Sequence, residues 1–258
     1  MGYDNLRTVA IIPARYASTR LPGKLIKNEA KKYTGKFLIE HVYERVKEAE
    51  NLQEIFVAAD DERICEVVNK FGGRVKMTSV THQSGTDRIA EAASDLDADF
   101  IVNIQGDEPD IRGDMIDDLI NTMYTEKEAP ICTLANEIRS KDELVDPNAV
   151  KVVLDKDGYA MYFSRASIPY VRDKNNSSGF TSFTFLKHLG IYIYRKDFLL
   201  AFSSLPVPMV EEAEKLEQLR VLSNGYKIKV VTTPHICEGV DTPDDFERFL
   251  NKYSIKNQ

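Results

Sequence analysis

Cationic side chains stand in a short loop directly after an apolar segment, which is a placement suited to phosphate binding. Arg15, Arg20 and Lys24 follow the apolar residues 9–13. Guanidinium groups bind phosphate oxygens through paired hydrogen bonds, and a lysine acts as a point charge. Gly23 lets the backbone amides of the loop approach an anion. The loop therefore predicts a polyphosphate site, with a solvated basic loop as the alternative.

Two aspartates occupy comparable positions and suit a divalent cation. Asp107 follows the apolar residues 100–104, and Asp241 lies between a strand-like segment and a helix start. Mg²⁺ takes carboxylate oxygens and keeps several waters. Either aspartate could instead serve a turn or a helix cap, although Thr242 is better placed for the cap. One carboxylate from each loop, holding one Mg²⁺ beside a polyphosphate, predicts chemistry on a nucleoside triphosphate.

The sequence excludes two common nucleotide-binding loops. A phosphate-binding loop of the G-x-x-x-x-G-K-[ST] type would need glycine where Ser18 stands and a hydroxyl where Leu25 follows the lysine. A G-x-G-x-x-G fingerprint does not follow the first apolar segment. We therefore expect neither a P-loop nor a dinucleotide site.

The composition of the chain indicates which kinds of binding partner to exclude and which cellular compartment to expect. The 258 residues carry a formal net charge of -7, which argues against nucleic acid or an anionic membrane as the main partner. Cys65, Cys132 and Cys237 are scattered and lack metal-ligand spacing, so we expect free, buried thiols in a reducing compartment. No apolar stretch approaches the ~20 residues of a membrane span, and no signal-peptide pattern precedes the first strand. These features predict a cytoplasmic protein.

The first half of the chain alternates between strand-like and helix-like segments. Short apolar runs indicate strands buried on both faces, and amphipathic stretches between them indicate helices. The expected strands are 8–13, 55–59, 75–78 and 100–104, and the expected helices include 38–49, 64–71 and one capped by Ser84 or Thr86. This rhythm predicts a parallel sheet, and ligands of such sheets bind beyond the carboxyl ends of the strands. Both informative loops fall at that edge.

The second half has a different pattern. Residues 149–154 and 159–163 flank a turn at 155–158 and predict a hairpin, whereas 188–195 alternates as a strand. The polar stretch 173–182 predicts a mobile loop. We expect a single helix over 211–222, then a strand over 227–233 and a final helix capped by Thr242. One stripe of the 211–222 helix carries Ala213, Leu216, Leu219 and Leu222.

Several motifs, in order over nearly the whole chain, resemble those of 3-deoxy-D-manno-octulosonate (KDO) cytidylyltransferases, also called CMP-KDO synthetases. The motifs are IIPARYASTRLPGK (11–24), HQSGTDR (82–88), NIQGDEP (103–109), PNAVKVV (147–153), YFSRA (162–166), KHLGIY (187–192), LEQLR (216–220) and VDTP (240–243). Two positions depart from the family pattern, because Leu25 and Phe37 stand where prolines are common. Residues 27–34 form a small insertion, and Asp87 replaces a usual glutamate.

The resemblance implies a fold, an activity and partners. The fold would be α/β, a nucleotide-diphospho-sugar-transferase-like (Rossmann-like), mostly parallel sheet flanked by helices. Residues 7–130 and 227–258 would form the nucleotide-binding core, and 131–226 a smaller α+β part for sugar binding and dimerisation. The activity would be transfer of CMP from CTP to KDO, with Mg²⁺ as cofactor, for lipopolysaccharide biosynthesis by a homodimer; the 211–222 stripe would contribute to the dimer contact or to the core.

Two alternative functions stay open at this point. One is a cytidylyltransferase for 8-amino-3,8-dideoxy-manno-octulosonate or another keto-sugar acid. The other is a catalytically silent nucleotide-binding regulator on the same fold, which the intact Asp107 and Asp241 pair disfavours.

The resemblance also implies roles for individual residues. The catalytic set would be Arg15, Lys24, Asp107 and Asp241, with both aspartates binding the metal. The nucleotide-binding set would be Ala14, Arg15, Ser18, Arg20, Lys24, Ser84, Gly85, Arg88, Gln105 and Asp107. The sugar-binding set would be Gln105, Arg165, His188, Tyr192, Glu217 and Gln218. Arg88 could instead be an exposed helix charge, and His188 a core histidine with its hydrogen bonds satisfied.

Overall fold

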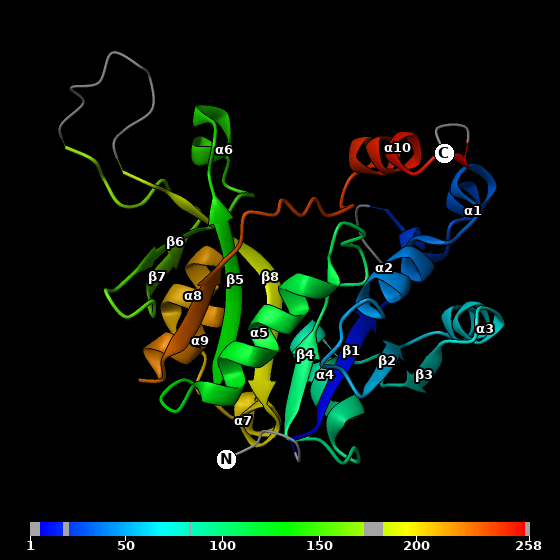
Figure 1. Cartoon of the computed structure of the whole chain (residues 1–258), viewed down its shortest axis with the longest axis horizontal. Helices are drawn as coiled ribbons and strands as arrows, with labels where there is room; N and C mark the ends of the chain where they lie inside the picture. The colour runs from blue at the N-terminus through cyan, green and yellow to red at the C-terminus, as the bar shows by residue number, and fades with distance from the viewer. Residues whose placement is uncertain (1–5, 18–20, 83, 173–182, 256–258) are drawn as a thin grey trace.

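One sheet runs through both halves of the part of the chain that the computed structural model describes, residues 6–17, 21–82, 84–172 and 183–255 (Figure 1). Its strands are β1 (Thr8–Ala14), β2 (Glu54–Ala59), β3 (Arg74–Met77), β4 (Phe100–Asn103), β5 (Ile131–Glu137), β6 (Lys151–Leu154), β7 (Ala160–Ser164), β8 (Leu186–Arg195) and β9 (Ile228–Thr232). The strand order is β3-β2-β1-β4-β8-β5-β9, and β6 pairs with β8 and β7. Parallel pairing joins β1 to β2 and β4, β2 to β3, and β5 to β9, which confirms the predicted mostly parallel sheet.

Helices cover both faces of this sheet. They are α1 (Asn28–Thr34), α2 (Leu38–Val46), α3 (Glu62–Lys70), α4 (Gly85–Ala93), α5 (Gly113–Thr125), α6 (Lys141–Val145), α7 (Lys196–Phe202), α8 (Met209–Glu214), α9 (Gln218–Ser223) and α10 (Pro243–Lys252). Along β1, Ala10 and Ile12 belong to the buried cluster that also contains residues of α2, α3 and α5, whereas Val9 and Ile11 belong to the cluster on the other face, with residues of α4, α7 and α9. All four side chains are fully buried, as expected of a strand covered on both faces.

Predicted helix caps position two loops of the sheet edge. Ser84 begins α4, and its Oγ accepts a hydrogen bond from the Asp87 amide at 3.1 Å. Thr242 begins α10 in a capping box with Asp245, and Pro243 occupies the first helical position. The predicted hairpin of β6 and β7 also forms, with Gly158 at φ +78° in its turn. The stretch predicted as a mobile loop, 173–182, lies outside the described residues.

The predicted helix over 211–222 is wrong, because the chain breaks it into α8 and α9. Lys215 adopts a left-handed conformation, φ 52° and ψ 48°, and ends α8. Leu216 and Leu219 are buried in the core, whereas Ala213 is exposed, so the predicted stripe is not one continuous surface. The apolar spacing survives the break because both leucines still face the core. A lysine gives no sequence signal for a left-handed residue.

Some elements of the fold were not predicted from the sequence. The inserted residues 27–34 contain the whole of α1, which packs beside α10. The buried strand β5 and the long helix α5 were not predicted, although both contribute to the core.

Strand β8 runs antiparallel to its neighbours in the sheet and carries a bulge. It runs antiparallel to β4 on one side and to β5 on the other. Tyr192 pairs with Thr133 and Leu189 with Leu134, so Gly190 and Ile191 have no opposite residue in β5. The Thr133 hydroxyl lies 3.2 Å from the Leu189 carbonyl oxygen and 2.7 Å from that of Ile191. The bulge therefore bends β8 beside the strand ends that carry the site.

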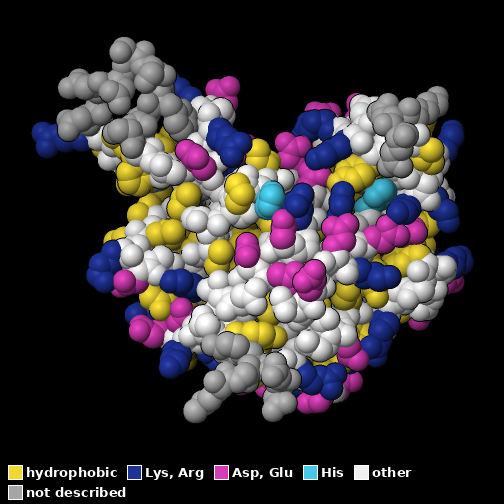
Figure 2. All heavy atoms as spheres, viewed as in Figure 1, with side chains coloured by type: hydrophobic (Ala, Val, Ile, Leu, Met, Phe, Trp, Pro, Cys, Tyr) yellow, Lys and Arg dark blue, Asp and Glu magenta, His cyan; other side chains and the backbone are white. Residues whose placement is uncertain are grey.

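Two groups of elements rise beyond this edge of the sheet. In the view of Figure 1, α6 with the β6–β7 pair stands on one side, and α1, α2 and α10 stand on the other. Figure 2 shows that the surface is hollowed between them. The predicted division into a core and a sugar-binding part stays a prediction, and β8 of the second part lies inside the common sheet.

Candidate active site

The basic loop after β1 turns back on itself and directs Lys24 inward. The Tyr16 carbonyl oxygen accepts a hydrogen bond from the Gly23 amide at 3.0 Å. Gly23 has φ +65°, and a Cβ there would lie 3.3 Å from the Tyr16 ring, so the turn favours glycine. Arg15 is exposed, whereas Lys24 is 8% exposed. Ser18 and Arg20, the other predicted phosphate-binding residues of this loop, lie outside the described residues.

The ammonium group of Lys24 joins three segments that are far apart in the sequence. Its Nζ lies 2.5 Å from Asp107 Oδ2, 3.0 Å from Asp241 Oδ1 and 2.8 Å from the Val240 carbonyl oxygen. The expected meeting of the basic loop with both acidic loops at one edge of the sheet is therefore confirmed. This contact is a charge-assisted cluster of one cation and two carboxylates.

Backbone contacts hold the two acidic loops together. The Val240 amide donates to the Asp107 carbonyl oxygen at 2.8 Å. A Cβ at Gly106 would lie 3.0 Å from the Pro13 carbonyl oxygen, so this glycine permits the close approach of the loop to β1. The Asp245 carboxylate accepts the amides of Asp241 and Thr242. The positions of both predicted metal-binding carboxylates are therefore fixed by the backbone.

Glu108 adds a third carboxyl group behind this cluster. Burial raises its pKa to about 8, and the charge of Asp107 adds to the shift. Its Oε2 is shielded from solvent and has no hydrogen-bond partner among the described residues. Glu108 therefore carries its proton near neutral pH.

The donor set fits one hard cation. Asp107 and Asp241 each place one carboxylate oxygen within 3.0 Å of a single point, the Lys24 ammonium, which is itself a cation. No cluster of three or more His, Cys, Asp or Glu side chains suited to a metal occurs in the described part of the chain. Two carboxylates suit Mg²⁺, because this ion keeps several waters and completes its shell with substrate phosphates.

Arg88, predicted to bind cytosine, lies inside the protein. Its guanidinium donates to Asp60 Oδ2 at 3.0 Å and to Thr78 Oγ1 at 2.7 Å, and the residue is 3% exposed. The alternative of an exposed helix charge is therefore wrong. Asp60 Oδ1 also accepts the Tyr16 amide at 2.9 Å. Sequence analysis missed Asp60, although it follows a buried strand as Asp107 does, and it links α4 to the basic loop.

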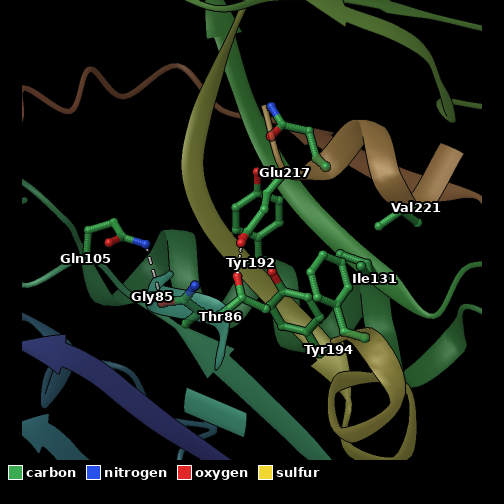
Figure 3. A pocket seen from close by; sticks show the side chains of 11 residues that line it. Gly85, Thr86, Gln105, Ile131, Tyr192, Tyr194, Glu217 and Val221 are labelled. Carbon is green, nitrogen blue, oxygen red and sulfur yellow. Dashed lines mark hydrogen bonds between the residues drawn. The ribbon is translucent and has the colours of Figure 1, made fainter. Parts of the chain in front are cut away.

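A cavity of about 110 Å³ lies next to the acidic loop, between α4, β8 and α9 (Figure 3). The structure brings Gly85, predicted for the nucleotide, together with four residues predicted for the sugar. These four are Gln105, Tyr192, Glu217 and Gln218. The remaining lining residues are Thr86, Asn103, Ile131, Tyr194, Phe202 and Val221. Of these, Thr86 is a polar residue that sequence analysis left without a site role, although it lies inside the motif 82–88.

Two tyrosines and one histidine in and beside the cavity are held neutral. Burial raises the pKa of Tyr192 and of Tyr194, and the charge of Glu217 adds to both shifts. Burial lowers the pKa of His188 to about 3. The His188 Nε2 lies 3.0 Å from Thr133 Oγ1, and its ring lies 5.3 Å from that of Tyr192. Near neutral pH these groups therefore offer uncharged hydrogen bonds.

Arg165 supports the backbone that presents the sugar-binding residues. Its guanidinium donates to the carbonyl oxygens of Glu214 at 2.7 Å, Pro147 at 2.9 Å and Lys215 at 3.4 Å. Its charge is directed at carbonyl groups of the α8–α9 turn, and Glu217 follows that turn by two residues. Binding of a sugar carboxylate by Arg165 stays a prediction.

Comparison with known proteins identifies the family. Residues 9–228 match the model of the cytidylyltransferase family. A 3-deoxy-manno-octulosonate cytidylyltransferase of Geobacter metallireducens is 49% identical over 254 residues, which cover 96% of this chain and 98% of the relative. The protein of the same name from Thermodesulfovibrio yellowstonii is 48% identical, with coverage of 96% and 99%. The chain belongs to the 3-deoxy-manno-octulosonate cytidylyltransferase family.

Solved structures agree with this assignment. A CMP:2-keto-3-deoxy-manno-octonic acid synthetase in complex with CTP superposes with a TM-score of 0.88 at 41% identity, covering 95% of this chain and 98% of that structure. A putative glucose-1-phosphate thymidylyltransferase from Bacillus anthracis, 17% identical, has a TM-score of 0.63 with 95% coverage of both chains and shows the shared fold alone. The cytidylyltransferase family and its α/β fold are thus established for this chain, which contains no membrane-spanning helix among its described residues.

Proposed function

We propose that this protein transfers CMP from CTP to the anomeric 2-hydroxyl of KDO, giving CMP-KDO and pyrophosphate for lipopolysaccharide biosynthesis. The observation that carries the proposal is the cluster of Lys24 with Asp107 and Asp241 at the sheet edge. Gln105, in the same loop as Asp107, lines the adjacent cavity, so the two halves of the reaction have neighbouring sites. The names of the relatives and the CTP complex of the similar structure supply the substrates.

The reaction is an in-line displacement at the α-phosphorus of CTP. The 2-hydroxyl oxygen forms the new bond to phosphorus, the α–β bridging bond breaks, and pyrophosphate leaves with the electron pair while the hydroxyl proton passes to solvent. Positioning and charge neutralisation supply most of the rate in such transfers. Arg15, Arg20 and Lys24 bind the β- and γ-phosphates, with Ser18 as a further donor, and Ala14 brings the loop to the nucleotide.

Asp107 and Asp241 hold Mg²⁺ in this proposal. When bound, the ion neutralises phosphate charge and lowers the pKa of a coordinated hydroxyl. Ser84 and Gly85 form the cytosine site at the start of α4, and Arg88 supports that turn from inside the protein through its ion pair with Asp60. Gln105, His188, Tyr192, Glu217 and Gln218 bind the sugar hydroxyls, and Arg165 binds or positions its carboxylate end.

A pyrophosphate-release screen tests the proposal. Each of the four ribonucleoside triphosphates is incubated with Mg²⁺ and with KDO, 8-amino-3,8-dideoxy-manno-octulosonate or a sialic-type acid. We expect release with CTP and KDO. Turnover of the 8-amino sugar without turnover of KDO would move the chain to the alternative acceptor, and CTP binding without release for any acid would indicate a silent regulator.

We further propose a cytoplasmic homodimer. Exposed apolar side chains between residues 145 and 210 support a subunit contact formed by the second half of the chain. They include Val145 (60% exposed), Met161 (64%), Tyr170 (80%) and Met209 (85%). Isolated large apolar side chains are normal on a surface, but their concentration in one part of the chain favours an interface. Light scattering after gel filtration should give twice the chain mass, and Met161→Lys with Met209→Lys should give the monomer mass.

A further inference from the structure

Thr86 joins the helix of the nucleotide site to the segment of the sugar site. It lies in the first turn of α4, directly after Ser84 and Gly85, and is 5% exposed. Its hydroxyl donates a hydrogen bond to Glu217 Oε2 at 2.5 Å (Figure 3). Glu217 is the residue before α9, so this contact spans two segments 131 residues apart.

Glu217 needs such a donor to keep one orientation. A glutamate side chain loses rotamer freedom when it is ordered, and this loss opposes a fixed carboxylate. The backbone of the preceding turn is fixed by Arg165, which donates to the Glu214 and Lys215 carbonyl oxygens. The carboxylate end is fixed by Thr86. With Oε2 held, the remaining lone pairs of the carboxylate can accept hydroxyl groups of a sugar.

A second hydrogen bond links α4 to the end of α7, and neither of its two residues lines the cavity. Ser203 Oγ donates to Asp87 Oδ1 at 2.5 Å, and Ser203 is an exposed residue at the end of α7. The first turn of α4 is thus linked to α7 through Asp87 and to α9 through Thr86. The two links differ in one respect, because Thr86 and Glu217 line the cavity and Ser203 does not.

We propose that Thr86 is a positioning residue that couples CTP binding to sugar binding. Cytosine bound at Ser84 and Gly85 orders the first turn of α4, and Thr86 then holds the Glu217 carboxylate in place for the acceptor. Coupling of this kind is reciprocal, so the sugar must strengthen CTP binding by the same factor. The inference rests on the proposed function, and it names the element through which the two substrate sites communicate.

Substitution of Thr86 by valine tests the coupling. Thr86→Val keeps the shape of the side chain and removes the hydroxyl. A hydrogen bond to a charged group contributes enough to predict a rise of about tenfold or more in the KM for KDO. We expect kcat to stay within about twofold and, because the coupling is reciprocal, the KM for CTP at saturating KDO to rise by a similar factor. Thr86→Ser, which restores the hydroxyl, should recover both KM values. Titration calorimetry with CTP alone should give equal affinities for Thr86→Val and wild type.

Matched variants separate positioning from a general effect on α4. Ser203→Ala removes the other link and should leave the KM for KDO unchanged. In a double-mutant cycle, Thr86→Val combined with Glu217→Gln should be no worse than Glu217→Gln alone. An unchanged KM for KDO in Thr86→Val, or a weaker affinity of that variant for CTP alone, would overturn the coupling. A wild-type enzyme that releases no pyrophosphate from CTP with KDO would instead overturn the proposed function.

Discussion

The sheet edge brings charged side chains together, whereas the tyrosines and the histidine in and beside the adjacent cavity are uncharged. At the edge, Lys24, Asp107 and Asp241 are brought together as a cation and two carboxylates. In and beside the cavity, burial keeps Tyr192, Tyr194 and His188 uncharged. The first region suits a triphosphate and a metal ion, and the second suits the hydroxyl groups of a sugar. One end of a single sheet can therefore hold two chemically distinct subsites.

The two regions also differ in how the chain builds them. The sheet edge uses loops after strands and before helices, each fixed by backbone hydrogen bonds such as that from Val240 to Asp107. The cavity uses one antiparallel strand, β8, and the helices α4 and α9, and α9 follows a turn that contains the left-handed Lys215. Changes at the edge should therefore affect mainly chemistry, whereas changes at the cavity should affect mainly acceptor binding.

Removal of the Asp107 carboxylate should have the largest effect. Asp107→Ala deletes one of the two proposed metal ligands, and we expect turnover to fall by about a thousandfold or more, since the metal contributes several kcal/mol of charge stabilisation. Pyrophosphate release at saturating CTP and Mg²⁺ measures the change. Asp114→Ala, which breaks an exposed ion pair with Arg112 on α5, is the control. Near-normal turnover of Asp107→Ala would refute the metal assignment.

Loss of the Asp60 charge should destabilise the fold behind both subsites. Asp60→Asn leaves the guanidinium of buried Arg88 without its counter-ion, which should cost about 3 kcal/mol of unfolding free energy. Urea denaturation measures the loss.

The neighbouring Asp61→Asn is a matched control for Asp60→Asn. Asp61 caps α3, and asparagine caps nearly as well, so we expect a small change. Equal destabilisation by the two variants would show that the Asp60–Arg88 pair has no special role.

Replacement of Lys24 should show whether its ammonium group and Mg²⁺ compete for the carboxylates of Asp107 and Asp241. Lys24→Met should lower kcat/KM by about a hundredfold, because a phosphate contact is lost. It also leaves Asp107 and Asp241 close together without the ammonium group. We therefore expect Mg²⁺ without nucleotide to raise the melting temperature of Lys24→Met more than that of wild type. Equal shifts in calorimetry would show that Lys24 and the metal do not share these carboxylates.

The smallest expected effect is the change of the unfolding free energy with pH that is caused by the buried, neutral side chain of His188. The pKa of His188 is about 3 in the folded protein against 6.5 for an ordinary histidine, so the unfolded chain binds the extra proton between these values. Stability from this group is present above pH 6.5 and is lost as the pH falls toward 3. Relative to His188→Gln, wild type should lose about 2 kcal/mol between pH 7 and pH 5. Parallel pH curves for the two proteins would show that His188 is not buried as a neutral group.

The site residues that follow strand ends were the ones best predicted from the sequence. Asp107 and Asp241 each follow a strand and precede a helix, so the meeting of the acidic loops with Lys24 could be inferred from the alternation of strands and helices. The caps Ser84 and Thr242 were also predictable, because a hydroxyl before an amphipathic stretch has few other uses.

Features set by tertiary contacts could not be inferred. Lys215 takes a left-handed conformation that the spacing of Leu216 and Leu219 conceals, so one predicted helix became two. The partner of Arg88 was not predictable either, because Asp60 lies 28 residues away and resembles a turn residue. The link between Thr86 and Glu217 depends on α9 packing against α4, which no local pattern encodes.

The bulge in β8 has a consequence for how this strand tolerates length changes. Leu189, Ile191 and Ile193 pack on one side of the sheet, and Tyr192 and Tyr194 on the other. Gly190 and Ile191 are the unmatched residues, and an even number of them preserves the alternation on both sides of the bend. Deleting one residue here would turn every later side chain of β8 to the opposite face of the sheet. Tyr192 and Tyr194 would then point into the core on the side of Leu189, and Ile193 would point toward the substrate cavity. Lengthening or shortening at this point is therefore tolerable only in steps of two.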